Sequence, residues 1–445
     1  MSEAPGHMRP RIRIGTFVLA LALAAAATGQ ETDDASSLVP TFQEGDIIRF
    51  EQTDKLRPFL PEPFWDNRDF FFHEGMRLEI GPTQRDYSPS PEVTSATEFY
   101  RGQARIGPDN SLENWTAGRP FPIDEIDCRG DPQAGVKIMW DFQALGGDGQ
   151  AHFFYSYWDR GERLPLYYEG TGQRVQLAHR FEEKYREMNG DIFRGEKRKF
   201  AFGVDVVAPF DARGIQLLSY RYKKSDQPRA EARNDDTWVY VPTLRRVRRI
   251  SSAQRTDAIA GTDFTFDDLR SFNGIIPQYE WECLGERRMI GPMNTKVKGY
   301  PYEKNHSFGP YGLSFADDRW ELREVWLLRM TPKNEDHPYH HKDIYIDRQT
   351  FTPMYSFAYD RKDELWKIIW HNKRWSQDES LTGAWFPGWK EVPNPRALVV
   401  VSDIIANVQT GTGNRIEFWD AHGTPLSSKG KIRRYIDVGR LTKGR

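Results

Sequence analysis

Acidic and basic side chains crowd into the stretch "DTWVYVPTLRRVRRISSAQRTDAIAGTDFTFDDL", which runs from Asp236 to Leu269. Two of its carboxylates, Asp263 and Asp268, could form the acid and base pair of a glycosidase. The arginines that precede them, among them Arg248 and Arg249, would instead hold both carboxylates ionised and so remove the acid. Ion pairing is therefore the favoured interpretation, and a secreted carbohydrate-active enzyme is the alternative.

Three histidines stand together in "HPYHH", at positions 337, 340 and 341. A metal site would need two of them to converge with a carboxylate such as Asp336 or Asp343. His340 and His341 are adjacent, and on a strand adjacent side chains point to opposite faces. We therefore expect a solvated loop before a strand, with no metal and no cofactor.

The remaining reactive residue types carry weaker signals. His152 opens the run "HFFYSYW" and His371 follows Trp370, so both are expected at strand ends rather than as general bases. The two cysteines, Cys128 and Cys283, have no metal-like spacing. They could form a disulfide in an oxidising compartment, but the sequence leaves their pairing open. A thiol enzyme is not expected.

The first thirty residues indicate the compartment. Three arginines precede an apolar run at 14–27, which ends on small residues. This pattern is typical of a secretory signal peptide at 1–30, and the run is shorter than the roughly 18 residues of a membrane-spanning helix. A retained anchor helix is the alternative. We expect a cleaved signal and a protein exported to the periplasm of a Gram-negative bacterium.

Composition limits the class of protein further. The mean hydropathy of -0.71 argues against a helical membrane protein, so any membrane contact should be transient. The formal net charge of -2 provides no overall electrostatic attraction to nucleic acid. Aromatic residues make up 13% of the chain, which favours large buried or ligand-facing surfaces.

Alternating apolar and polar residues predict strands that must position these groups. One run alternates Leu218, Tyr220 and Tyr222 with polar residues. Another alternates Trp366, Ile368 and Trp370 with Lys367 and Ile369, so each strand should have one face toward solvent. Short polar turns between such strands predict antiparallel meanders. Helical signals are few, at 180–190 and 264–274, while the proline- and aromatic-rich part of 30–70 predicts an extended wrap over a core.

The opening stretch has its own expected layout. Trp238 and Tyr240 alternate along a strand that Pro242 ends, because proline cannot donate a hydrogen bond. The arginines that follow cannot all avoid the apolar side, and a buried guanidinium needs a partner. We expect that partner among the aspartates at 263, 267 and 268.

Several blocks carry a family resemblance. The combination of "TWVYVP", "RRVRRI" and "GTDFTFDDL" resembles the signature of periplasmic LolA/LolB-like proteins, the outer-membrane lipoprotein-sorting superfamily. More closely, the chain resembles a large uncharacterised family within it, the domain-of-unknown-function family thirteen twenty-nine. That resemblance spans nearly the whole mature chain and rests on four blocks: 44–89, "LENWTAGRPFP" at 112–122, "AGVKIMWDF" at 134–142, and "HPYHHKDIYIDRQTFTPMYSFAYDRKDELWK" at 337–367.

The resemblance implies a fold and a role. The fold would be mainly β, a large incomplete antiparallel barrel with few helices covering an apolar cavity. The chain departs from the small lipoprotein carriers in being more than twice their length, so residues 31–145 would be an N-terminal elaboration that forms one continuous body with a half barrel at 146–445. The role would be to carry lipidic or other hydrophobic cargo, beside an RND-type inner-membrane transporter and an outer-membrane partner. A periplasmic adaptor that binds a transporter without carrying cargo is the alternative, and its mark would be a filled barrel with an exposed apolar patch.

Ligand-binding residues follow from the same resemblance. The cavity wall would include four aromatic residues, Trp238, Tyr240, Phe264 and Phe266. Arg248 or Arg249 would meet an anionic head group or Asp263, and the aspartates, Asp268 among them, would fix the turn at the cavity mouth.

Overall fold

The computed structural model describes residues 38–83, 85–144, 148–161, 163–251, 255–297, 306–378, 396–419 and 428–442, which belong to one compact unit. The predicted signal peptide at 1–30 and the predicted boundary near Gly146 lie outside these ranges. Within them, no helix combines the length and the apolar character that a bilayer crossing requires.

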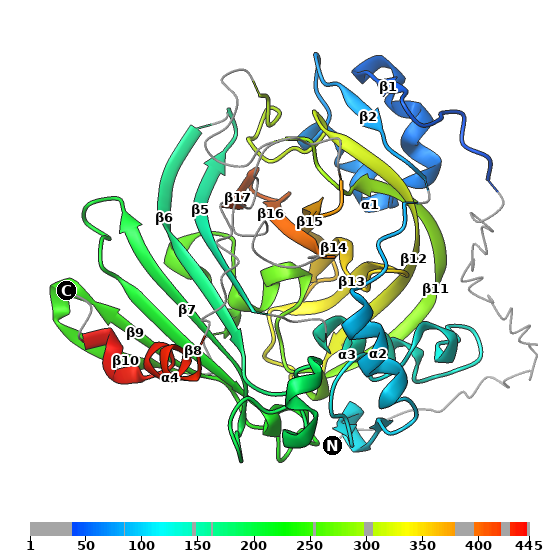
Figure 1. Ribbon diagram of the computed structural model, residues 1–445. Helices are drawn as coiled ribbons and strands as arrows, with labels where there is room; N and C mark the ends of the chain where they lie inside the picture. The colour runs from blue at the N-terminus through cyan, green and yellow to red at the C-terminus, as the bar shows by residue number, and fades with distance from the viewer. Residues whose placement is uncertain are drawn as a thin grey trace, which may run out of the picture. The chain divides into compact units, whose positions relative to one another are not determined.

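Seventeen strands form the framework among the described residues, and fifteen of them make one sheet (Figure 1). The strands are β1 (Ile47–Ile48), β2 (Leu78–Ile80), β3 (Arg105–Ile106), β4 (Leu112–Glu113), β5 (Gly149–Asp159), β6 (Arg163–Gln176), β7 (Arg198–Ala208), β8 (Gln216–Tyr222), β9 (Asp236–Val241), β10 (Arg246–Ile250), β11 (Tyr279–Pro292), β12 (Arg319–Pro332), β13 (Tyr339–Asp347), β14 (Pro353–Asp360), β15 (Leu365–Trp375), β16 (Leu398–Asn407) and β17 (Thr412–Trp419).

The large sheet is curled and open. Its order is β1-β2-β12-β13-β14-β15-β16-β17-β5-β6-β7-β8-β9-β10, with β11 on the other side of β12. In Figure 1, β5–β10 lie to the left, β11 and β12 to the right, and β13–β17 between them. Pairing is antiparallel except where the short β2 runs parallel to β12. The expectation of a mainly β, incompletely closed architecture is confirmed, although the sheet is mixed rather than purely antiparallel.

The strand register assigns every side chain to one of two faces. Along β14–β17, Tyr355, Trp370 and Ile404 share one face, and Ile369, Ile405 and Ile416 share the other. We name the first the terminal face, because segments from the two ends of the chain cover it. The second is the loop face, because residues 255–273 cover part of it.

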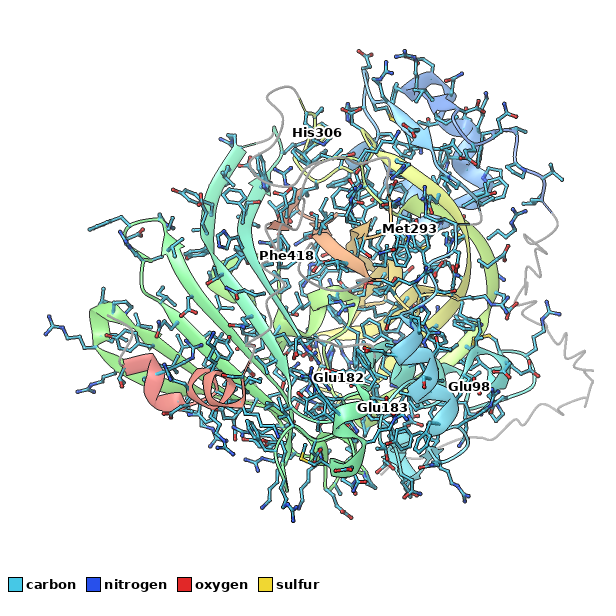
Figure 2. The ribbon with its side chains drawn as sticks, in the orientation of Figure 1. Glu98, Glu182, Glu183, Met293, His306 and Phe418 are labelled. Carbon is cyan, nitrogen blue, oxygen red and sulfur yellow. A yellow bond between two sulfur atoms is a disulfide. The ribbon has the colours of Figure 1, made fainter. Side chains whose placement is uncertain are left out.

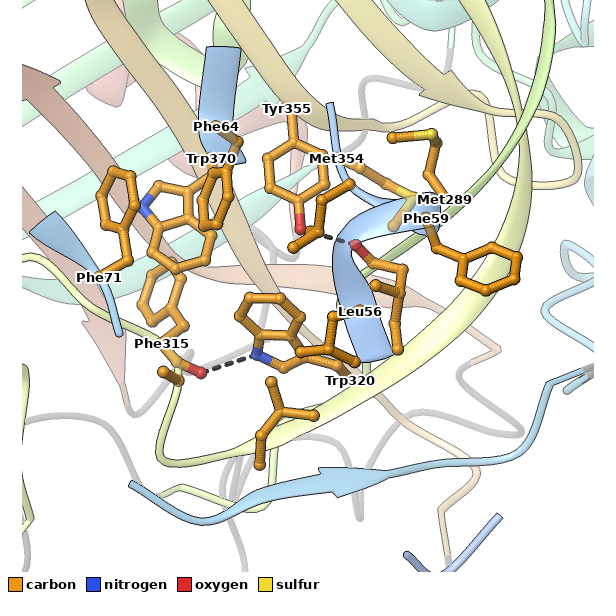
Figure 3. Packing of buried hydrophobic residues seen from close by; sticks show 14 of the residues in the cluster. Leu56, Phe59, Phe64, Phe71, Met289, Phe315, Trp320, Met354, Tyr355 and Trp370 are labelled. Atoms are coloured by element: carbon orange, nitrogen blue, oxygen red, sulfur yellow. Dashed lines mark hydrogen bonds between the residues drawn. The ribbon is translucent and has the colours of Figure 1, made fainter. Parts of the chain in front are cut away.

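Segment 42–87 covers the terminal face of β11–β16. It forms helical turns, the 3₁₀ segments Phe50–Phe59 and Arg68–Phe70 and helix α1 (Glu62–Asp66), where an extended wrap was predicted. Its Phe64 and Phe71 rings stack at 4.6 Å between centroids and contact Trp370 (Figure 3). The indole of Trp320 donates to the Phe315 carbonyl at 2.7 Å, so the buried N–H is satisfied. On this side the sheet is filled by its own aromatic residues.

Helix α3 (Ala134–Ala144) packs on β11 next to the disulfide. A Cβ atom at Gly135 would lie 2.9 Å from the Glu282 carbonyl carbon, so glycine permits this close approach. Beside it, Cys128 and Cys283 are bonded, with their Cα atoms 5.4 Å apart. The structure thus supplies the pairing that the sequence left open.

The other helices lie outside the central sheet. Helix α2 (Pro91–Phe99) precedes the small β3–β4 sheet. Helix α4 (Lys429–Tyr435), near the C-terminus of the chain, lies against strands of the large sheet. The two predicted helical windows are 3₁₀ turns at Glu183–Met188 and Phe266–Ser271. The first ends at Asn189 with φ of 52°, in agreement with the predicted Asn-Gly stop.

Candidate ligand-binding face and its ionic anchors

Strands β6–β10 form a wing whose two faces differ. On the terminal face, Leu218 and Tyr220 of β8 pack with Ile432 and Ile436 of the α4 region, and all four side chains are buried. Gly203 of β7 lies under the same helix, since a Cβ there would be 2.2 Å from the Tyr435 hydroxyl. The C-terminal helix therefore covers this face of the wing over β7 and β8.

The loop face of the wing is apolar and only half-buried. Cross-strand register places Phe202, Val204, Leu217 and Val239 on this face. Each keeps part of its surface exposed, whereas the neighbouring Leu218 on the opposite face is fully buried. A half-exposed sheet of branched and aromatic side chains is the surface that an apolar ligand needs.

The aromatic residues predicted for the cavity wall separate between the two faces. Trp238 and Tyr240 lie on the terminal face, and the Trp238 ring meets that of Tyr220 edge-on at 4.9 Å. Phe264 lies on the loop face and is buried against Tyr155, while Phe266 is half-buried. Phe418 of β17, labelled in Figure 2, is partly buried in the same cluster as Phe264. The structure does not bring the four predicted aromatic residues together.

The predicted ion pairs of the strand arginines are wrong. Arg249 pairs with Asp236 on the adjacent strand β9, and Arg248 is exposed on β10. Asp263 accepts from Asn407 Nδ2 and Thr412 Oγ1, both at 2.7 Å. Sheet register sets these partners, so sequence proximity to the arginines did not identify them.

Asp268 anchors the loop 255–273 to the sheet. Its carboxylate accepts from Lys342 Nζ at 2.7 Å, from Lys367 Nζ at 3.1 Å and from the Tyr339 hydroxyl at 2.7 Å. Burial alone would raise the pKa of Asp268, but the two ammonium groups and the hydrogen bonds hold it well below its ordinary value. Asp268 is therefore an ionised structural group and unsuited to act as the acid of a glycosidase.

A second ionic cluster holds the same loop. Arg221 donates two 2.9 Å hydrogen bonds to Asp235, and Arg255 bridges Asp235 and Asp267. Burial would raise the pKa of Asp235, but the two guanidinium groups lower it below its ordinary value. The loop is thus fixed by full charges, and such buried pairs persist only when each charge has its counterpart.

A hydrogen-bonded chain of Ser271, His371 and Asp403 joins the loop to β15 and β16. Ser271 Oγ lies 2.6 Å from His371 Nε2, and His371 Nδ1 donates to Asp403 at 2.6 Å. His371 is inside β15 and fully buried, so its expected place at a strand end is wrong. Burial lowers the pKa of His371 and keeps the imidazole neutral. The order of groups is that of a serine hydrolase, but Ser271 is only 1% exposed, which closes its hydroxyl to a substrate.

Arg270 differs from these paired cations. It has φ of 55°, its guanidinium lies 5.9 Å from the Phe142 ring, and its buried Nε has no hydrogen-bond partner. No carboxylate of the described residues lies within ion-pair distance of it. Arg174 shares the loop face with Phe202, and burial followed by the charge of Arg270 lowers the pKa of Arg174 to about 9. Arg270 is therefore a cation without an ion-pair partner among the described residues, and its charge acts on Arg174 of the loop face.

The fold and this face define a class of β-rich protein, an open curled sheet with one closed side and one apolar side still half-exposed. The chain belongs to the DUF1329 family, described as a protein family of unknown function, whose profile matches residues 70–411. The family predicted from sequence is thereby confirmed.

Several relatives are similar to this chain. An uncharacterised protein of Pseudomonas aeruginosa is 27% identical over 266 residues, which cover 58% of this chain and 54% of that protein, so the match spans about half of that relative. A solved DUF1329 family protein from Desulfovibrio piger is 17% identical, over 70% of this chain and 99% of that one, with a TM-score of 0.44. A putative outer membrane lipoprotein-sorting protein domain from Vibrio parahaemolyticus is 16% identical, over 70% and 100%, also with a TM-score of 0.44.

Proposed function

We propose that this protein is a periplasmic binding and carrier protein for lipidic molecules, held on the loop face of the wing. The observation that carries the proposal is the contrast between the two faces of β7–β9. Under α4, Leu218 and Tyr220 of β8 are buried, while Phe202, Val204, Leu217 and Val239 on the other face remain half-exposed. Apolar surface of this kind is stabilised by covering it with an apolar ligand.

The proposed cargo is an acyl chain that ends in a carboxylate. Burying a twelve-carbon chain would contribute about 0.8 kcal/mol per methylene, or roughly 10 kcal/mol before entropic costs. Arg270, which makes no ion pair with the described residues, offers one positive charge and a planar fork that suits one carboxylate. The other basic groups of the loop clusters already have carboxylate partners, as Arg221 and Lys342 show.

The role proposed is binding and not catalysis. Asp263 and Asp268 are both engaged by neighbouring side chains, which argues against the carbohydrate-active alternative. The partners expected from the family resemblance, an RND-type transporter and an outer-membrane protein, stay a prediction. Export to the periplasm rests on the N-terminal sequence pattern at 1–30.

Two measurements test the proposal. Native mass spectrometry of protein isolated from the periplasm without detergent, followed by organic extraction, should reveal a stoichiometric lipidic adduct. Calorimetric titration with laurate and with dodecanol then separates the contribution of the ligand's alkyl chain to binding from that of its carboxylate head group. Binding of laurate alone or in preference supports the full proposal, and equal binding of both contradicts the role of Arg270 while preserving the apolar site. A protein that binds neither and carries no adduct contradicts the carrier function and favours the adaptor.

Arg270→Asn is the matched variant, because asparagine tolerates the left-handed backbone at this position. It should weaken laurate binding by about tenfold or more and leave dodecanol binding unchanged, since a charged hydrogen bond contributes about 1.5–3 kcal/mol. Arg248→Gln, on exposed β10, is the control and should change neither.

A further inference from the structure

Two consecutive histidines and an aspartate converge at one end of β13, away from the wing. His340 and His341 follow Tyr339, the first residue of β13, and Asp363 lies in the turn between β14 and β15. The pairing of β13 with β14 shifts register between Tyr339 and His341, which is a β-bulge. A bulge inserts one unpaired residue and re-aims its side chain. The expectation that these two histidines point to opposite faces fails for that reason.

Three ligand atoms form a nearly regular triangle. His340 Nδ1 and His341 Nδ1 are 2.9 Å apart, and they lie 3.1 Å and 3.2 Å from Asp363 Oδ1. Ligand atoms about 2.0–2.1 Å from a tetrahedral zinc ion are separated from one another by roughly 3.3 Å. The three atoms are therefore spaced like one face of a metal coordination tetrahedron.

Hydrogen bonds alone do not account for this triangle. Each Nδ1 carries either one proton or one lone pair in the ring plane, and an ionised carboxylate brings no proton. If both nitrogens donate to Asp363, two N–H groups face each other at 2.9 Å. If one nitrogen donates to the other, the acceptor nitrogen meets the Asp363 oxygen at 3.2 Å with no proton between them. A cation shared by all three atoms removes both conflicts.

The surroundings are those of a metal ligand set. The His341 ring stacks on Tyr359 at 4.2 Å, which fixes its orientation. Its other nitrogen, Nε2, lies 3.9 Å from Asp343 Oδ1, which is too long for a hydrogen bond but places a further carboxylate beside the His341 ring. Arg329 is close, but it makes two 2.8 Å hydrogen bonds to Asp343, so its charge is compensated.

We propose that His340, His341 and Asp363 bind a divalent transition-metal ion such as Zn²⁺. Two imidazoles and one carboxylate suit zinc and similar first-row ions, and three protein ligands leave a coordination position open. The side chains of His340 and Asp363 are 52% and 59% exposed, so that position faces solvent. Water or a ligand of the medium completes the coordination.

The test is calorimetric titration of zinc chloride into the full chain, prepared without a polyhistidine tag and treated with a chelator. We expect one ion per chain for the wild type. His340→Ala and Asp363→Asn should each weaken zinc binding more than about tenfold, because each removes one of three ligands. Both changes lie at exposed positions, and asparagine accepts the positive φ of 64° at position 363.

His73→Ala is the control, because it removes a histidine that lies on another segment, where its Nδ1 is hydrogen-bonded to the Glu74 carbonyl. Zinc binding within about twofold of wild type is expected for it. Zinc should also raise the Tm of the wild type and of His73→Ala but not of the two ligand variants. Absence of binding in the wild type, or equal binding in all four proteins, would overturn the metal site.

Discussion

Strands β14–β16 and strands β7–β9 follow the same alternation, yet their surroundings differ. In the first group, here called the packed half, segment 42–87 covers one face and the loop 255–273 covers the other. Lys367, on the face expected to be wet, is buried and paired with Asp268. In the wing, α4 covers one face and the other stays half-exposed. Alternation therefore locates a strand, while the elements that pack on it decide what each face does.

The largest difference should appear on truncating aromatic residues. Phe64→Ala, in the packed half, should lower the free energy of unfolding by about 3–5 kcal/mol, because Phe64 is 0% exposed and the cavity cannot collapse. Phe202→Ala, in the wing, should cost about 1–2 kcal/mol, since part of that ring already faces solvent. Urea unfolding measures both, and equal losses would contradict the contrast between the two regions.

Ion pairs should show the same contrast. Asp268→Asn leaves Lys342 and Lys367 buried without a full counter-charge and should cost about 3–5 kcal/mol. Arg249→Gln in the wing removes an exposed partner of Asp236 and should cost less than about 1 kcal/mol. Chemical denaturation of both variants measures these two losses in the free energy of unfolding. A small loss for Asp268→Asn would mean that the loop is held by packing and not by charge.

Acid should weaken strands β13–β15, around His337 and His371. Burial lowers the pKa of His337 to about 4 and lowers that of His371 as well, so both rings are neutral in the folded protein. Their contribution to stability is complete above the unfolded pKa of about 6.5 and is lost as the pH falls toward the folded values. For His337 the loss at pH 5 is about 2 kcal/mol.

Hydrogen exchange at pH 7 and pH 5 measures this effect. Amides of β13–β15 should lose protection as the pH falls. His337→Asn should flatten part of the pH dependence, since the amide oxygen can still accept from the Tyr339 N–H. An unchanged dependence in this variant would assign the acid sensitivity to other groups.

The smallest predicted difference is between substitutions on the two faces of the wing. Trp238→Ala should cost about 1–2 kcal/mol by loosening the contact with Tyr220 under α4. Its effect on laurate binding should be smaller than that of Phe202→Ala, because Trp238 lies on the closed face. If Trp238→Ala weakens laurate binding more than Phe202→Ala does, the ligand lies on the terminal face.

The sequence predicted elements more reliably than partners. Alternation located β8 and β15, and the blocks at 112–122 and 337–367 identified the family. The partners of Asp263, by contrast, are Asn407 and Thr412, which lie more than 140 positions away in the chain. Only the sheet order brings them together, and no local pattern encodes that order.

The sequence pattern did not predict the candidate metal ligands, for a different reason. The pattern "HPYHH" was noticed, but ideal strand geometry separates consecutive side chains, and a bulge of one residue reverses that conclusion. Likewise, Ser271 and His371 gave no joint signal, because one lies in a loop and the other in a strand of the sheet.

The place of β5 in the sheet has a consequence for biogenesis. Its outer neighbour is β17, which pairs with the aromatic run His152–Trp158, whereas β6–β10 follow β5 directly in the chain. Because the polypeptide is synthesised from its N-terminus, the β5–β10 meander can form early. Its β5 border then stays without a partner until β17, near the other end of the chain, has been made. An unpaired, aromatic strand border invites association with other chains. Safe maturation therefore depends on shielding this border until β17 arrives to close it.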